Sequence, residues 1–215
     1  MFWPEKCLNC NLMPINIPFR YKIFTPLQSQ QFSLQWVYNI LEHRILSRII
    51  YEDPNPETGF ILAQDFKWSG ETVSDLHCLA IIHKRGIKSL RDLDSTHLPL
   101  LRNIQEFCIK VMWEKYELRS EEVRMYFHYH PTYYHLHVHV TSSSRRFRSH
   151  HLLLDKVICN IEWDPFYYQK TTLSFMVKER ENLFGKLFDS RKRRRDWSYS
   201  PIQQKLMKMA HGEIL

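Results

Sequence analysis

The stretch Tyr126–Thr141 reads YFHYHPTYYHLHVHVT and holds five of the protein's twelve histidines. From His135 to Val140 it alternates histidine with an aliphatic residue. Because a β-strand turns successive side chains to opposite faces, this alternation predicts a strand over Tyr134–Thr141 with a row of imidazoles on one face and core residues on the other. We expect His128, from a neighbouring segment, to approach the same surface.

Three interpretations of this row remain open from the residues alone: a metal site, nucleophilic phosphoryl transfer, and a strand face that is histidine-rich by accident. His-x-His on a strand suits zinc, but His135 and His139 would be about 13 Å apart on a straight strand, too far to share one ion. A neutral central imidazole, His137, is a competent nucleophile near neutral pH.

Length and composition limit the kind of protein that can carry these histidines. With 215 residues and 44% hydrophobic content, the chain suffices for one sizeable domain with extensions. No apolar run reaches the roughly 20 residues of a membrane-spanning helix, and the first residues lack a secretory signal. The five cysteines are scattered, and the lone pair Cys7 and Cys10 has no second pair to complete a zinc site. We therefore expect a protein of the cytoplasm and nucleus, without a membrane partner.

The net charge of +7 is unevenly distributed. Seven Lys or Arg and two acids follow residue 190, so this tail carries +5 and the rest of the chain carries 7 minus 5, or +2. The run Arg191–Arg195 has the composition of a nuclear-localisation signal or a nucleic-acid contact, and equally that of a solvated tail.

The chain divides into an irregular arm at 1–30, a domain at 31–188 and a basic tail at 189–215. Hydrophobic periods predict helices over 34–50, 95–118 and 151–161, the first capped by Ser33. They predict strands over 60–63, 77–83, 123–129, 134–141 and 171–177. Long helices among strands, without regular βαβ alternation, indicate an α+β fold with an antiparallel sheet.

The alternating run also carries a resemblance to a known family. His135-Leu136-His137-Val138-His139-Val140 resembles the motif of the histidine-triad superfamily of nucleotide hydrolases and transferases. The preceding His128–Tyr134 segment is similar to one branch, the scavenger mRNA decapping enzymes. Four further segments agree with that branch over about residues 26 to 177: Gln35–Leu41, Glu52–Phe60, Asp65–Trp68 and Arg85–Leu93.

The resemblance implies a dimeric histidine-triad domain that hydrolyses short capped RNA or cap dinucleotides and releases 7-methylguanosine monophosphate, with no cofactor. By position, His137 is the nucleophile that forms a phosphohistidine, and His135, His139 and His128 assist it. Trp36 stacks on the charged 7-methylguanine, a cation–π contact of about 0.5 to 2 kcal/mol. The remaining implied contacts are Asp65 to the cap nucleoside, Lys67 to ribose or phosphate, and Thr132, Tyr133 and Arg148 to phosphate.

Two departures from the family pattern bear on selectivity. The family has a large N-terminal domain that closes over the site, where this sequence has only the 1–30 arm, and it places a glutamate for the guanine edge where this chain reads His43-Arg44-Ile45-Leu46-Ser47. Two alternatives therefore stay open: a broader nucleotide hydrolase, and a catalytically weak protein that binds caps or RNA. Selectivity for the methylated cap, and binding without turnover, distinguish them.

Overall fold

The computed structural model describes residues 12–17, 33–129, 131–145 and 151–178. The chain separates into two compact units, one of residues 14–176 and the other of residues 1–13 with 177–215. The first unit holds the six-stranded sheet that carries the histidines. No helix within the described ranges combines the length and the apolar character needed to cross a membrane.

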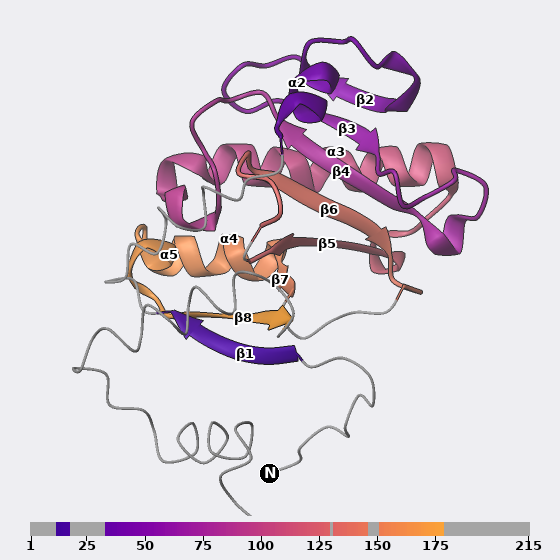
Figure 1. Cartoon of the computed structure of the whole chain (residues 1–215). Coiled ribbons are helices and arrows are strands. Elements are labelled where there is room, and N and C mark those ends of the chain that lie inside the picture. Colours follow the sequence, from indigo (N-terminus) through magenta and orange to yellow (C-terminus); the bar gives the residue numbers. More distant parts are fainter. Residues whose placement is uncertain (1–11, 18–32, 130, 146–150, 179–215) are drawn as a thin grey trace, which may run out of the picture. The chain divides into compact units, whose positions relative to one another are not determined.

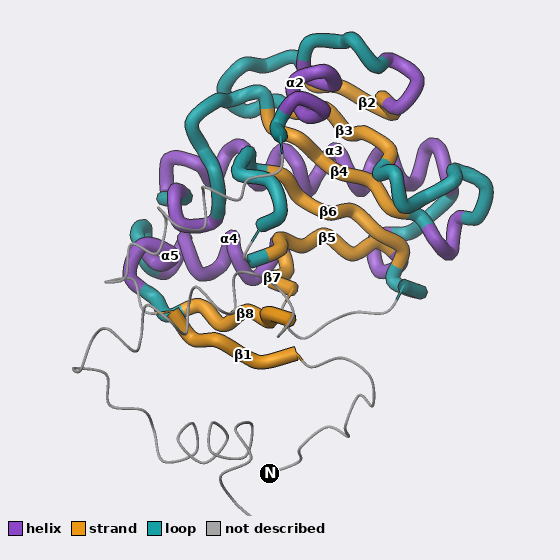
Figure 2. The backbone as a smooth tube through the Cα atoms, in the orientation of Figure 1, coloured by secondary structure: helices purple, strands orange, loops and turns teal. Residues whose placement is uncertain are grey.

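The sheet is antiparallel throughout, with strand order β2-β3-β4-β6-β5-β7 (Figures 1 and 2). Its strands are β2 (Ile49–Asp53), β3 (Phe60–Gln64), β4 (His77–Ile82), β5 (Val123–His128), β6 (His137–Ser142) and β7 (His151–Leu153). A separate two-stranded sheet pairs β1 (Leu12–Ile17), which lies in the stretch predicted to be irregular, with β8 (Leu173–Lys178). The predicted α+β class with an antiparallel sheet is confirmed.

Helices cover both faces of the main sheet. The long helix α3 (Leu98–Tyr116) packs beside α4 (Leu154–Trp163), and both lie behind the sheet in Figure 1, whereas α2 (Gln35–Leu41) lies in front. The α2 residues Val37 and Ile40 are buried against Ile61, Ala63, Leu79 and Ile81. A short helix, α5 (Tyr167–Lys170), follows α4.

The register of β6 confirms the alternation read from the sequence between residues 137 and 140. His137 pairs with Ile81 and His139 with Leu79, so these histidines share the sheet face that α2 covers in part. Val138 and Val140 point to the opposite face and are fully buried. The histidine face is therefore held by a core on its reverse side.

Three predicted boundaries were wrong. The helix predicted over 34–50 ends at Leu41. His43 then takes a positive φ of 56°, Leu46–Arg48 forms a short 3-10 helix, and Ile49 and Ile50 lie in β2. Isoleucines there fit a strand as well as a helix, and pairing with β3 decides between them. The predicted strand at Tyr134 begins only at His137, and the helix predicted from His151 begins at Leu154 because His151–Leu153 pairs with β5.

Candidate active site

His137 is held in one tautomer by its own main chain. Its Nδ1 lies 2.8 Å from the carbonyl oxygen of His135, so Nδ1–H donates and Nε2 keeps its lone pair. The residue is partly exposed and lines a small hollow with His128, Pro131 and Ser89. Desolvation by burial lowers the pKa of the ring, which favours the neutral imidazole. His137 is therefore a neutral imidazole at a partly exposed position in the lining of this hollow.

His135 lies just before β6, so it is not part of the strand as predicted. It is buried, and its Nε2–H donates to the carbonyl oxygen of Ile82 at 2.8 Å. The Tyr38 ring meets it edge-on, with centroids 6.1 Å apart. Burial lowers its pKa, so the imidazole is neutral. Within β6 itself the alternating histidines are His137 and His139, whose ring centroids are 5.2 Å apart.

His139 is buried among aromatic rings. Tyr126 stacks on it at 5.2 Å and 11°, and the His128 ring lies 4.1 Å away, centroid to centroid. Its Nδ1 is 3.0 Å from Nε2 of His77, whereas its own Nε2 is buried without a hydrogen-bond partner among the described residues. Burial lowers its pKa well below the ordinary value. A buried polar nitrogen without a partner is uncommon in a folded protein, so His139 Nε2 marks this cluster as a candidate site.

Two histidines that sequence reasoning missed complete the cluster. His77 opens β4 and approaches His139, and its pKa is lowered by burial to about 4. His151 in β7 lies 3.2 Å from His128, Nε2 to Nε2, and stacks on Tyr126 with ring centroids 4.1 Å apart. Strands β4, β6, β5 and β7 thus each contribute a histidine. Neither residue carries a local motif, because only strand pairing brings it to the site.

The predicted cap-stacking residue lies in an aromatic group. Trp36 of α2 is partly exposed and meets Tyr133 edge-on at 4.9 Å and Phe66 at 6.1 Å, centroid to centroid. Its indole Nε1 is buried and has no hydrogen-bond partner within the described part of the chain. Phe66 is 61% exposed. The structure thereby brings together three aromatic rings from α2, the loop after β3 and the loop before β6.

The remaining predicted contacts lie close by or outside the described residues. Asp65 is buried; its Oδ1 accepts the Lys67 backbone N–H at 2.7 Å. Lys67 is exposed, and its positive charge contributes to lowering the pKa of His137 and of His139. Thr132 is exposed in the loop before β6. Arg148, the Cys7 and Cys10 pair and the Arg191–Arg195 run lie outside the described residues.

The two acids nearest to the expected glutamate both have side-chain partners. Glu52 lies 2.7 Å from Nε2 of His43, and Glu42 lies 2.8 Å from Arg44. In the segment His43–Ser47, where a glutamate was expected from the resemblance, Leu46 is 65% exposed. This segment therefore offers no carboxylate that could accept hydrogen bonds from a guanine edge.

The arrangement is suited to attack on an electrophilic phosphorus. A neutral imidazole with a free nitrogen faces a hollow, with further imidazoles and Lys67 beside it to bind negative oxygens. An exposed aromatic group, Trp36 with Tyr133 and Phe66, offers a stacking surface for a base.

Comparison with known proteins finds similarity to one family of enzymes. The family model described as "Scavenger mRNA decapping enzyme C-term binding" matches residues 35–151. The chain is 43% identical over 173 residues to a Bos taurus protein named m7GpppX diphosphatase, covering 77% of this chain and 51% of that protein. Proteins of the same name from Ascaris suum and Homo sapiens are 45% identical, covering 74% and 73% of this chain and 54% and 48% of theirs. The chain thus spans about half the length of these relatives.

Proposed function

Because this chain belongs to the scavenger mRNA decapping enzyme family, we propose that it hydrolyses cap dinucleotides and short 7-methylguanosine-capped RNA, releasing 7-methyl-GMP. The similar curated proteins are named m7GpppX diphosphatases. The observation that carries the proposal is the hydrogen bond from Nδ1 of His137 to the His135 carbonyl oxygen, because it leaves Nε2 free to attack phosphorus.

In the first step, Nε2 of His137 attacks the phosphate attached to 7-methylguanosine. A P–N bond forms, the anhydride P–O bond breaks, and the remainder of the cap leaves with its own terminal phosphates. As the imidazole becomes positively charged, the His135 carbonyl oxygen accepts a stronger hydrogen bond from Nδ1–H. The main chain therefore stabilises the charge that develops on the nucleophile.

In the second step, water attacks the same phosphorus and the P–N bond breaks, which frees His137 and 7-methyl-GMP. The ring of His139 lies 5.2 Å from that of His137, and the ring of His128 lies 4.1 Å from that of His139, centroid to centroid. With its proton on Nε2, His139 is a donor for a phosphate oxygen. His128 is assigned to assist at the phosphate or the leaving group.

Cap binding is assigned to the aromatic group. Trp36 offers an indole beside Tyr133 and the exposed Phe66, and a 7-methylated base carries the positive charge that makes such stacking stronger. Asp65 and Lys67 follow β3 next to this group; Asp65 stays the predicted contact to the cap nucleoside, and Lys67 stays the predicted contact to ribose or phosphate. Thr132 and Arg148 stay predicted phosphate contacts.

The test compares m7GpppG with unmethylated GpppG as substrates for the purified chain, with nucleotide products resolved by chromatography. Faster release of 7-methyl-GMP from the methylated dinucleotide is expected. Equal turnover of both would make the protein a broader nucleotide hydrolase. Measurable cap binding without any product would make it a binding protein. Either result would overturn the proposal.

Homodimerisation and location in both nucleus and cytoplasm belong to the same proposal. Exposed Trp113 of α3 and Trp163 of α4, which are 56% and 80% exposed, offer apolar surface for a second copy. Light scattering on the purified chain tests the dimer. The Arg191–Arg195 run has the composition of an import signal, and its deletion should exclude a fluorescent fusion from nuclei.

A further inference from the structure

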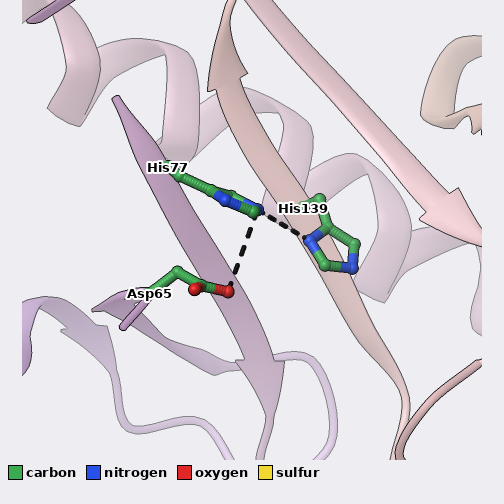
Figure 3. A group of neighbouring side chains, drawn as sticks. All are labelled: Asp65, His77 and His139. Carbon is green, nitrogen blue, oxygen red and sulfur yellow. Dashed lines mark hydrogen bonds and ion pairs between the residues drawn. The ribbon is translucent and has the colours of Figure 1, made fainter. Parts of the chain in front are cut away.

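We propose that Asp65, His77 and His139 form a binding site for one divalent transition-metal ion of the Zn²⁺ class. One carboxylate oxygen and one nitrogen of each imidazole all lie within 4.8 Å of one another. Figure 3 shows the three side chains converging from the residue after β3, from β4 and from β6. The inference does not rest on the proposed function.

The distances between the three ligand atoms fit a shared metal ion, whereas a single proton can join only two of them. A proton joins Nε2 of His77 to Nδ1 of His139 at 3.0 Å, but Oδ2 of Asp65 lies 3.8 Å from the same His77 nitrogen, beyond hydrogen-bond range. Zn–N and Zn–O bonds of about 2.0–2.2 Å in a tetrahedron place ligand atoms roughly 3.3–3.5 Å apart. The His77–His139 distance of 3.0 Å is slightly shorter than this spacing, and the His77–Asp65 distance of 3.8 Å is slightly longer. Small side-chain shifts would therefore let all three atoms coordinate one ion.

The burial of the three side chains and the position of the two histidines in the sheet support the same inference. Asp65, His77 and His139 are 7%, 4% and 4% exposed, and both histidines stand on paired central strands of the sheet. Such a backbone holds ligands in place at little entropic cost. Two imidazole nitrogens with one carboxylate suit zinc and its neighbours, whereas Mg²⁺ and Ca²⁺ prefer oxygen. A fourth position would be left for water or a ligand oxygen.

Coordination would also determine the tautomer of His139. A metal on Nδ1 leaves the ring proton on Nε2, which is buried and has no partner among the residues that the structure describes. That Nε2–H would then be fixed as a donor beside His137 and His128, whose rings lie 5.2 and 4.1 Å from that of His139. The ion would therefore act through the orientation of His139.

The experiment titrates chelator-stripped protein with Zn²⁺ by calorimetry and with Co²⁺ by absorption spectroscopy, without substrate. The variants are His77→Phe and Asp65→Asn. The matched control is His43→Asn, because His43 lies outside the cluster and asparagine tolerates its φ of 56°. Melting temperatures in metal-free buffer identify any variant that does not fold, and Asp65→Asn preserves an oxygen for the Lys67 N–H.

We expect wild type and His43→Asn each to bind one metal ion per chain tightly. Both cluster variants should bind the ion with an affinity at least about tenfold weaker. A tetrahedral Co²⁺ spectrum should appear in the first two proteins only. Absence of binding in wild type, or equal binding in all four proteins, would overturn the proposal. Because no substrate is used, either result leaves the cap-hydrolysis test unaffected.

Discussion

The carbonyl oxygen of His135 accepts a 2.8 Å hydrogen bond from Nδ1 of His137, while the His135 ring donates to the Ile82 carbonyl oxygen at 2.8 Å. His135 thus links His137 to the end of β4. The main-chain oxygen sets the tautomer of His137, and the ring keeps that oxygen in place.

This link predicts the effect of two substitutions at His135. His135→Leu removes the donor and leaves the buried Ile82 carbonyl unpaired, so the free energy of unfolding should fall by about 1–3 kcal/mol. His135→Gln places an amide N–H near the same oxygen and should retain most of that stability. Urea unfolding curves of the three proteins measure the difference. Equal loss in both variants would show that the Ile82 contact contributes nothing.

The lowered pKa of His77 predicts a dependence of stability on pH. Burial shifts it from 6.5 in the unfolded chain to about 4 in the fold, so the unfolded state binds more protons between those values. Stability contributed by the neutral ring is complete above pH 6.5 and declines as pH falls toward 4, by at most about 1.4 kcal/mol per pH unit. His77→Phe should flatten this part of the curve. Denaturant titrations in chelator from pH 7 to 4 test this, and an unchanged slope would contradict it.

The sequence predicted the parts of the site that lie close together along the chain. Alternation over residues 137–140 predicted a strand there and its core face, and both are confirmed. The predicted start of this strand at Tyr134 was wrong, because residues 131–136 form a loop in which the Leu136 N–H donates to the Ile87 carbonyl oxygen. His77 and His151 were missed because nothing local marks them, and only the β4–β6 and β5–β7 pairings bring them in.

The position of Trp36 predicts a loss of cap affinity on substitution. Trp36→Ala removes the indole from the aromatic group and should weaken m7GMP binding roughly two- to thirtyfold, equivalent to about 0.5–2 kcal/mol. Trp36→Phe should retain part of the affinity. Trp163→Ala is the control, because Trp163 is 80% exposed on α4. Calorimetric titration with m7GMP measures all three, and wild-type affinity in Trp36→Ala would remove Trp36 from the site.

Two glycines should differ sharply in their tolerance of a methyl group. At Gly59 an added Cβ would overlap the carbonyl oxygens of Asp53 and Asn55, which are backbone atoms that cannot move aside. Gly59→Ala should therefore cost about 3 kcal/mol. Gly86 has φ of +92° but open space around it, so Gly86→Ala should cost only about 1 kcal/mol. Thermal and urea unfolding test the order, which the reverse ranking would contradict.

The most direct test of the account is to trap the covalent intermediate. Wild type and His137→Asn are mixed with m7GpppG, quenched in alkali, in which phosphohistidine survives, and examined by peptide mass spectrometry. We predict a 7-methyl-GMP adduct on His137 in wild type. His137→Asn should form no adduct and release no 7-methyl-GMP. Release of 7-methyl-GMP by His137→Asn at a rate near that of wild type would contradict it.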